Sequence, residues 1–240
     1  MQIKKTSPST KLELWYTSTG KYFLPNNADG DLIIQTIKNN YVFDEAVYKA
    51  ACKFIKKDTI VLDLGANFGQ MSILMAKHVG KLGNVYAFEA NKFVYSVLKK
   101  NIAINDAHVT PYFGAVYSKS GETLHFPQLN FERFACYGSY GLDYTTRDGV
   151  PVTSVAIDDL TFPGQISFMK IDLQGSDLFA LHGATKTIKK HKMAIIVEYE
   201  KAFEHECGYS LEEFAQFIKY IDYKVIDIID NTNYLLAPNM

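Results

Sequence analysis

The sequence predicts an α/β fold in which a mostly parallel sheet is covered by helices on both faces. Between residues 44 and 221, short apolar runs of strand length alternate with amphipathic segments of helix length. Strands that are apolar along their whole length have both faces buried, as in a parallel sheet between two helical layers. The last two predicted strands, 223–229 and 234–237, are joined by a short turn, so the sheet includes at least one antiparallel strand.

Residues 1–40 are expected to form an extension made of a β-hairpin and a helix, followed by the main domain in residues 41–240. Residues 11–16 alternate polar and apolar side chains, which is typical of a half-buried strand. Residues 17–20 can turn, and residues 21–24 can return as the second strand of the hairpin.

Strands and helices then alternate along the main domain. The predicted strands are 60–64, 85–88, 109–116, 166–171 and 193–197, and the predicted helices are 44–57, 70–79, 91–102 and about 176–190. Asn91 can cap the N-terminus of its helix, because its side chain can accept hydrogen bonds from the first free backbone amides. Ser210 and Glu213 form a capping box that opens the last helix, which ends near Ile221.

One long stretch, from about residue 118 to residue 163, breaks this alternation. It is rich in Gly, Tyr and Phe, and it is too long for a plain connection between two elements. We therefore expect an insertion or lid here, and we expect residues 118–148 to cover the acceptor site. The aromatic side chains that could stack on a flat acceptor, or could form a local core, are Phe126, Phe131, Phe134, Tyr137, Tyr140 and Tyr144.

The composition disfavours several classes of protein. The 25 basic residues almost cancel the 26 acidic ones, whereas a nucleic-acid-binding protein of this size usually has a basic excess. The N-terminus has no apolar segment of the signal-peptide kind, and no apolar run is long enough to span a membrane. Cys52, Cys136 and Cys207 are widely spaced and odd in number, so we expect free thiols, no metal site and a cytoplasmic location.

The strongest motif is a glycine turn at the end of the strand 60–64. The strand runs into Gly65 and Gly69, and a helix begins at Gln70. At such a turn the backbone can pass close to a ligand, and the helix N-terminus points towards that ligand. The turn lies at the carboxyl end of its strand, where α/β folds of this kind bind their ligands.

The next strand ends in an acidic residue, Glu89, 24 positions after Gly65 (89 − 65). A carboxylate at the tip of the second strand can accept hydrogen bonds from both ribose hydroxyls of NAD or of S-adenosylmethionine. NAD sites need a middle glycine so that the backbone can approach the pyrophosphate, but here the intervening residues are Ala66, Asn67 and Phe68. The sequence therefore favours an S-adenosylmethionine-dependent methyltransferase over the alternative, an NAD-dependent oxidoreductase.

At these motifs the chain resembles the FkbM-type methyltransferases. The shared motifs, which span roughly residues 41–200, are Asp63-Leu64-Gly65-Ala66-Asn67 with Gly69, Ala87-Phe88-Glu89, Lys170-Ile171-Asp172-Leu173-Gln174-Gly175, Leu181-His182-Gly183-Ala184 and Ile195-Ile196-Val197-Glu198. The resemblance implies a Rossmann-like class I methyltransferase fold with a mostly parallel seven-stranded sheet. It also implies methyl transfer to hydroxyl groups, often on sugars, glycolipids or polyketides. The expected cofactor-binding residues are Asp63, Gly65, Ala66, Asn67, Phe68, Gly69, Glu89, Ala90, Asn91, Ala115 and Asp172.

Asp172, Lys170 and Glu198 are the candidate catalytic residues. Asp172 follows a buried strand beside the crevice, so it is the first candidate for the base that removes the acceptor's proton. The alternative is that Asp172 orients the cofactor's amine or caps the next helix. Lys170 is expected to pair with a carboxylate, because an unpaired buried lysine is costly. Glu198 and Glu200 could line the acceptor site or lie at a solvated rim. His205 is a further candidate base, although a place in a surface loop is favoured for it because no second ligand lies at metal spacing.

Gln174 stands where the resembling family usually has Glu, so a carboxylate role at that position is lost. This difference supports a further alternative, an adenosyl-binding module whose active site has decayed. The leading prediction is an O-methyltransferase that acts on a sugar, a glycolipid or another small molecule, with no nucleic-acid partner.

Overall fold

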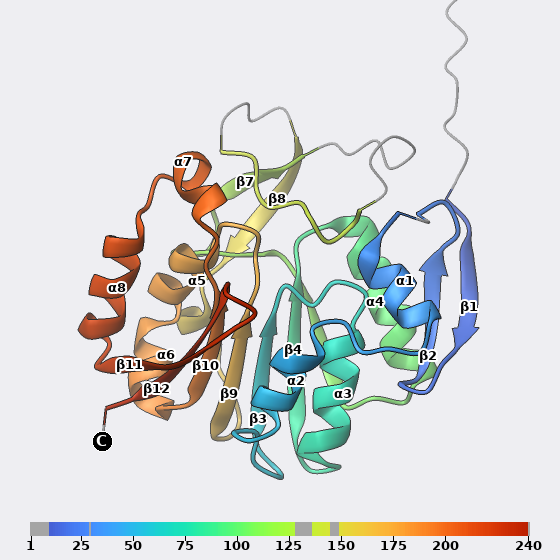
Figure 1. Ribbon diagram of the computed structural model, residues 1–240, viewed down its shortest axis with the longest axis horizontal. Helices are drawn as coiled ribbons and strands as arrows, with labels where there is room; N and C mark the ends of the chain where they lie inside the picture. The colour runs from blue at the N-terminus through green and yellow to red at the C-terminus, as the bar shows by residue number, and fades with distance from the viewer. Residues whose placement is uncertain (1–9, 29, 128–135, 145–148, 240) are drawn as a thin grey trace, which may run out of the picture.

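The computed structural model describes residues 10–28, 30–127, 136–144 and 149–239, and seven strands form its central sheet. The spatial order of the strands is β11-β12-β10-β9-β3-β4-β5 (Figure 1). Their bounds are Ile60–Leu64 for β3, Asn84–Glu89 for β4, Val109–Phe113 for β5, Ile166–Ile171 for β9, Ala194–Glu198 for β10, Tyr223–Ile229 for β11 and Asn233–Pro238 for β12. Strand β12 is antiparallel to both of its neighbours, and the five strands from β10 to β5 are parallel. This arrangement confirms the predicted fold class.

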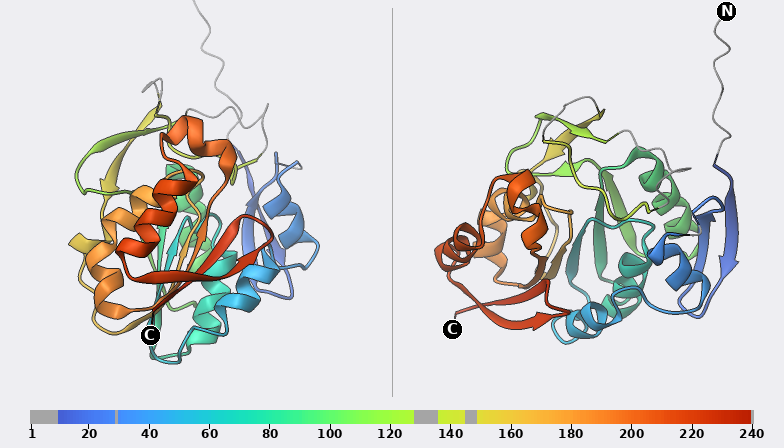
Figure 2. Two further views of the ribbon diagram at one scale, coloured as in Figure 1. Left: turned by 60° about the vertical axis from the view of Figure 1, so that its left-hand side comes forward. Right: turned by 45° about the horizontal axis from the view of Figure 1, so that its top comes forward.

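Helices cover both faces of the sheet (Figure 2). Their bounds are Glu45–Ala51 for α2, Gln70–Val79 for α3 and Lys92–Ile104 for α4 on one face, and Asp177–Gly183 for α5, Thr185–His191 for α6 and Leu211–Tyr220 for α8 on the other. Within β3, Val61 packs into the first of these layers, while Leu62 packs into the second. Both faces of the strand are therefore buried, which explains why every residue of its sequence except Asp63 is apolar.

Three elements differ from the sequence prediction. The predicted helix 44–57 ends at Ala51, because the chain then continues in tight turns in which the Lys53 and Phe54 amides donate to the Ala50 and Ala51 carbonyls. The predicted strand 109–116 is divided, because after Gly114 the chain leaves the central sheet and β6 (Ala115–Val116) pairs with β8 (Val150–Val155). The predicted helix 176–190 is two helices that meet at Ala184. The second helix begins there because Asp158 accepts hydrogen bonds from the amides of Lys186 and Thr187, 2.8 and 2.7 Å away. This cap comes from a distant part of the chain.

The described part of the insertion forms a small sheet of its own. Strand β8 lies between β6 and β7 (Thr123–Phe126), and the short 3₁₀ helix η1 (Ile157–Asp159) follows it. In Figure 1, β7 and β8 lie above the carboxyl ends of the central strands. Phe131 and Phe134 lie outside the described residues.

The N-terminal extension is a β-hairpin followed by a helix. Its elements are β1 (Leu12–Tyr16), β2 (Lys21–Pro25) and α1 (Leu32–Lys38). The hairpin is joined to α4 by Asn101, whose Oδ1 accepts from the Phe23 amide at 2.6 Å. The Asn101 amide group also donates to the Phe68 carbonyl at 2.9 Å, within the glycine turn. The extension therefore supports the turn that follows β3.

No helix among the described residues is both long enough and apolar enough to cross a membrane. Cys52, Cys136 and Cys207 are free cysteines. Within the described ranges, no group of three or more His, Cys, Asp or Glu side chains is arranged to hold a metal ion.

Candidate active site

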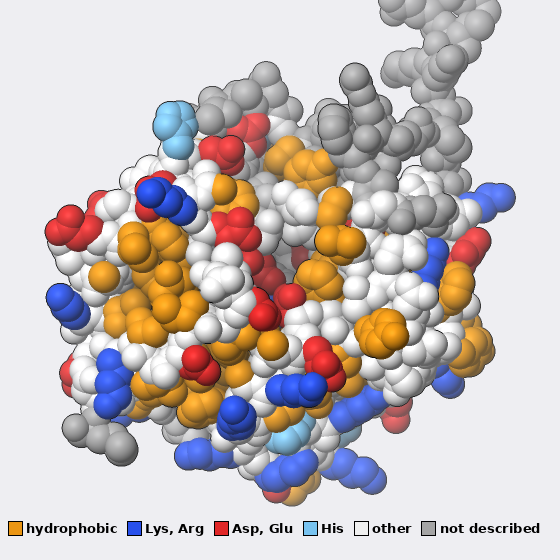
Figure 3. Space-filling model, viewed as in Figure 1, with side chains coloured by type: hydrophobic (Ala, Val, Ile, Leu, Met, Phe, Trp, Pro, Cys, Tyr) orange, Lys and Arg blue, Asp and Glu red, His pale blue; other side chains and the backbone are white. Residues whose placement is uncertain are grey.

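A cavity of about 350 Å³ opens at the carboxyl ends of β3, β4, β9 and β10. This volume lies within the range of roughly 300–1,000 Å³ that is typical of small-molecule sites. Figure 3 shows it as a hollow with acidic side chains along it. The sequence-predicted site residues that line it are Gly65, Ala66, Asn67, Phe68, Gly69, Glu89, Ala90, Ala115, Lys170, Asp172 and Glu198.

The glycine turn is shaped by its own protein neighbours as well as by the cavity. Gly65 has φ +90°, and a Cβ there would overlap the backbone carbonyl oxygen of Asp172. Gly69 has φ +89°, and a Cβ there would press against the Leu98 side chain of α4. Both positions adopt left-handed backbone that disfavours other residues. Glycine at these two positions therefore lets the turn pass close to the Asp172 backbone and to α4. The motif alone did not reveal this structural reason for the glycines.

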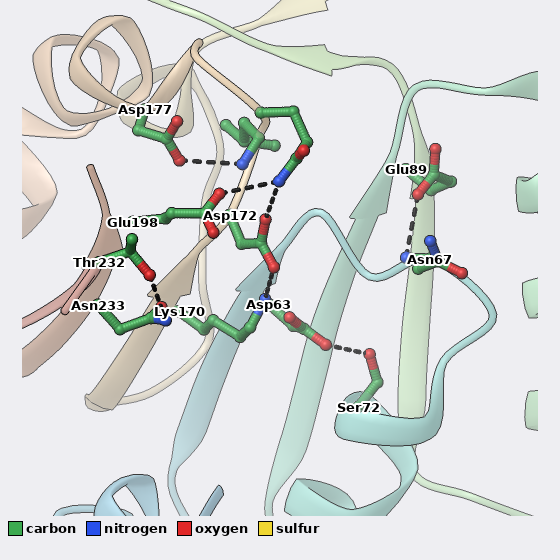
Figure 4. A network of polar contacts seen from close by, with 12 residues as sticks. Asp63, Asn67, Ser72, Glu89, Lys170, Asp172, Asp177, Glu198, Thr232 and Asn233 are labelled. Carbon is green, nitrogen blue, oxygen red and sulfur yellow. Dashed lines mark hydrogen bonds and ion pairs between the residues drawn. The ribbon is translucent and has the colours of Figure 1, made fainter. Parts of the chain in front are cut away.

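Glu89 lies at the tip of β4 and holds the glycine turn. Its Oε2 accepts from the Asn67 amide at 3.0 Å (Figure 4), and its Oε1 accepts from the Asn91 amide at 2.7 Å. Burial raises the pKa of Glu89 to about 7, although these backbone hydrogen bonds oppose the shift. Each carboxylate oxygen has a second lone pair, so Glu89 can still accept a ligand hydroxyl from the cavity.

Asp63 and Asn91, both predicted to bind the cofactor, are not among the residues that line the cavity. Asp63 is fully buried within β3, and its Oδ2 accepts a hydrogen bond from Ser72 of α3. Asn91 caps α4, because its Oδ1 accepts from the amides of Phe93 and Val94 at 2.9 and 3.2 Å. The structure therefore gives both side chains supporting roles, with Asp63 behind the turn and Asn91 at the start of a helix.

Lys170, Asp172, Gln174 and Glu198 form one polar cluster at the other end of the cavity (Figure 4). The Lys170 Nζ lies 2.7 Å from Asp172 Oδ2. The Gln174 side-chain amide donates to Asp172 Oδ1 at 3.2 Å and to Glu198 Oε2 at 2.9 Å. Gln174 therefore joins the two carboxyl groups that the sequence placed on separate strands.

The two carboxyl groups of the cluster, Asp172 and Glu198, have pKa values that are shifted in opposite directions. Burial alone would raise the pKa of Asp172, but the Lys170 charge and the hydrogen bonds from Lys170 and Gln174 lower it below its ordinary value. Burial and the nearby Asp172 charge raise the pKa of Glu198 to about 10. Near neutral pH, Asp172 is therefore ionised and Glu198 is protonated. A carboxylate with a lowered pKa is a weak general base, which favours an orienting role for Asp172.

Three further acidic residues, Asp44, Glu200 and Asp230, line the cavity together with the predicted cluster. The sequence left open a role for Glu200 at the acceptor site, but it did not single out Asp44 or Asp230. The three residues come from the start of α2, from the loop after β10 and from the turn between β11 and β12. No sequence motif links these three positions, and only the folded sheet brings them together.

The described residues of the insertion that line the cavity include 137–142. The Tyr137 amide donates to Asp31 Oδ2 at 2.6 Å, which ties this segment to the N-cap of α1. A Cβ on Gly141 would overlap the backbone of Gln174, so the segment packs directly on the polar cluster. By contrast, His205 is exposed in α7 (Glu204–Cys207) and is not among the lining residues.

Solved structures to which the chain is similar include several methyltransferases. A putative rRNA-methylase from Clostridium thermocellum is 14% identical with a TM-score of 0.50, and the match covers 80% of this chain and 92% of that one. An FkbM methyltransferase from Methylobacillus flagellatus is 16% identical with a TM-score of 0.47, over 79% of this chain and 49% of that one. A putative O-methyltransferase from Klebsiella pneumoniae is 13% identical with a TM-score of 0.46, over 83% and 82%. No curated protein sequence matches the chain.

The protein has a Rossmann-like sheet with a cavity at the carboxyl ends of its strands, and its class is that of the S-adenosylmethionine-dependent methyltransferases. The family model of the FkbM methyltransferase domain matches residues 63–225, which is more than half of the chain. The chain therefore belongs to the FkbM methyltransferase family, and its methyl donor is S-adenosylmethionine. This membership favours methyl transfer over the NAD-dependent alternative.

Proposed function

We propose that this protein transfers a methyl group to a hydroxyl group of a small molecule or a sugar. The observation that carries the proposal is the polar cluster beside the glycine turn, in one continuous cavity. The turn end offers backbone and Glu89 to an adenosyl ligand, and the cluster end offers Asp172 to the amine of the donor and Glu198 to a polar acceptor. Methyl transfer depends mainly on aligning the two reactants, and one cavity of this size brings them together.

The donor end is built to hold the adenosyl group of S-adenosylmethionine. We assign Glu89 to the ribose hydroxyls, because its carboxylate lies in the cavity at the tip of β4. Gly65, Ala66 and Asn67 supply the backbone around the donor, and Ala90 and Ala115 supply small apolar contacts. The donor, when bound, supplies an electrophilic methyl group on a positively charged sulfur.

The cluster end is assigned to the amine of the donor and to the acceptor. The ionised Asp172 is suited to hold a cationic amine, and Lys170 keeps it ionised. Protonated Glu198 can donate a hydrogen bond to an acceptor oxygen, because its raised pKa keeps its proton in place. We assign residues 137–142 to covering the acceptor, since they line the same cavity from the insertion.

The charge of the cavity favours a small polar acceptor over a nucleic acid. Its acceptor end includes Asp44, Glu200 and Asp230, and the red side chains in Figure 3 lie along the hollow. Nucleic-acid phosphates are bound through basic side chains, so an acidic rim of this kind would repel them.

The three free cysteines fit our proposal that the protein acts in the cytoplasm.

Gln174 argues against the alternative of a decayed site. Its amide group binds both Asp172 and Glu198, so the residue that replaces the family's usual Glu has a defined place in the cluster. These two hydrogen bonds hold Asp172 and Glu198 in one arrangement without a carboxylate at position 174, which supports an intact site.

A labelled-methyl experiment tests the proposed function. The purified protein is incubated with methyl-labelled S-adenosylmethionine and the small-molecule fraction of a cell extract, and products are identified by mass spectrometry. We expect a product that has gained one labelled methyl group as an ether. Label found only in added RNA, or only on nitrogen or carbon, would contradict the proposal.

A further inference from the structure

Asp44 occupies the N-cap position of α2 without capping that helix. Its backbone is left-handed, with φ 52° and ψ 48°, and its side chain makes no capping hydrogen bond. Aspartate at an N-cap ordinarily accepts a hydrogen bond from the first turn of its helix. Here the carboxyl group instead lines the cavity, next to the residues of the acceptor end. The left-handed backbone thus directs the side chain away from its usual structural partner.

The segment that precedes Asp44 is fixed to the glycine turn. Gln70, the first residue of α3, is buried, and its Oε1 accepts from the Phe43 amide at 2.9 Å. The Gln70 side-chain amide donates to the Tyr41 carbonyl at 2.8 Å. The same helix start that follows Gly69 therefore holds the backbone leading to Asp44. The start of α3 therefore fixes the position of Asp44 relative to any donor that the glycine turn binds.

The burial of Asp44 favours a carboxyl group that changes its charge near neutral pH. Burial raises the pKa of Asp44 to about 6, and the charges of Asp172 and Asp230 add to this effect. Lys170, from β9, opposes the shift. Among these charged groups, Lys170 lies on β9 and Asp172 directly follows that strand. Asp230 lies in the turn between β11 and β12. This value lies close to the operating range that suits a general base.

We propose that Asp44 is the general base that takes the proton of the acceptor hydroxyl group. This inference rests on the proposed function. As the hydroxyl oxygen bonds to the methyl carbon, the carbon–sulfur bond breaks and its electron pair stays on sulfur. The hydroxyl proton passes to the Asp44 carboxylate, S-adenosylhomocysteine leaves as a neutral sulfide, and the proton is then released to solvent.

The other carboxyl groups of the cluster are less suited to this step. Asp172 is held ionised by Lys170, so it has little tendency to accept a proton. Glu198 is already protonated near neutral pH. Asp44 makes no capping hydrogen bond and lines the cavity, so its carboxyl group can meet an acceptor. The ion pair of Asp172 and the protonated state of Glu198 suit these two groups to holding the reactants, and the uncapped Asp44 in the same cavity is left as the base.

The test compares Asp44→Asn with Asp106→Asn, using labelled S-adenosylmethionine and the small-molecule fraction that the wild-type protein methylates. Asparagine tolerates left-handed backbone, and Asp106 has a similar φ of 49° at an exposed turn, so the control matches the change in backbone and charge. We expect Asp44→Asn to lower the methylation rate by roughly 10²- to 10⁴-fold with little change in the dissociation constant for S-adenosylmethionine. The control should behave as the wild type.

The pH profile of the wild-type rate is a second measurement that does not depend on the folding of a variant. We expect the rate to rise with pH around an apparent pKa of about 6, because only the ionised form of Asp44 can accept the proton. A flat profile through this range, or an Asp44→Asn variant with wild-type rate, would overturn the inference. A parallel loss of donor affinity would instead make Asp44 a donor-binding residue and would equally overturn it. A wild-type protein that methylates no hydroxyl group would be a failure of the proposed function itself.

Discussion

At the scale of single residues, the site depends on a buried lysine with several acidic neighbours. Lys170 is almost fully buried, and Asp172, Asp63 and Asp44 all raise its pKa, whereas burial opposes them. A buried ammonium group is stable only while its partners remain, so the ion pair with Asp172 is as much a structural feature as a catalytic one. A simple loss of activity on changing Asp172 would therefore not identify its role.

We predict that Asp172→Asn lowers the free energy of unfolding by roughly 3–5 kcal/mol, because it leaves Lys170 buried with one partner fewer. The double variant Lys170→Met with Asp172→Asn should recover most of this stability, since it removes the buried charge as well. Its methylation rate should nevertheless stay lower by roughly 10²-fold, because the reactants are no longer aligned.

Urea unfolding and rate measurements on the single and double variants check this prediction. A single variant as stable as the wild type would show that the ion pair does not support the fold. A double variant with full activity would remove Asp172 and Lys170 from the function of the site.

At the scale of elements, the N-terminal hairpin supports the glycine turn through α4. Asn101 is fully buried and binds both the Phe23 backbone of β2 and the Phe68 carbonyl of the turn. Asn105, one turn further along, binds Lys21 of the same hairpin but is only half-buried. The two asparagines therefore hold the hairpin alike, but only Asn101 also reaches the turn.

We predict that Asn101→Ala destabilises the protein by about 1–3 kcal/mol, because buried backbone groups lose their partners. Asn105→Ala is the matched control, and it should cost only about 0.5–1.5 kcal/mol because water can reach the groups it leaves. Asn101→Ala should also weaken S-adenosylmethionine binding, which calorimetry can measure, whereas Asn105→Ala should not. Equal effects of the two changes on donor binding would contradict a link from the hairpin to the turn.

At the scale of the whole molecule, the sequence predicted the sheet well because its strands are buried on both faces. The apolar runs 60–64 and 166–171 coincide with β3 and β9. The break at Ala184 could not be predicted, since the cap that begins α6 is Asp158, which lies 28 residues from Lys186 in sequence. Local patterns record local burial, but they do not record contacts between distant segments.

The candidate site, like the fold, could be predicted from sequence only where local patterns mark it. Gly65 and Glu89 follow strands in a familiar spacing, so they could be placed at the cavity from sequence alone. Asp44 could not, because an aspartate before a helix normally predicts an N-cap. Gln174 appeared to weaken the site in sequence, whereas the structure shows that it joins two carboxyl groups.

The central claim is that the cavity at the carboxyl ends of the strands binds S-adenosylmethionine through Glu89. Calorimetric titration of the wild type, Glu89→Gln and Glu89→Ala with S-adenosylmethionine and with NAD tests it most directly. We predict that the wild type binds S-adenosylmethionine and not NAD, and that Glu89→Ala loses roughly 1.5–3 kcal/mol of binding free energy. Glu89→Gln should lose less, because its carbonyl oxygen can still accept one hydrogen bond. Tight binding of NAD, or wild-type affinity in Glu89→Ala, would contradict the claim.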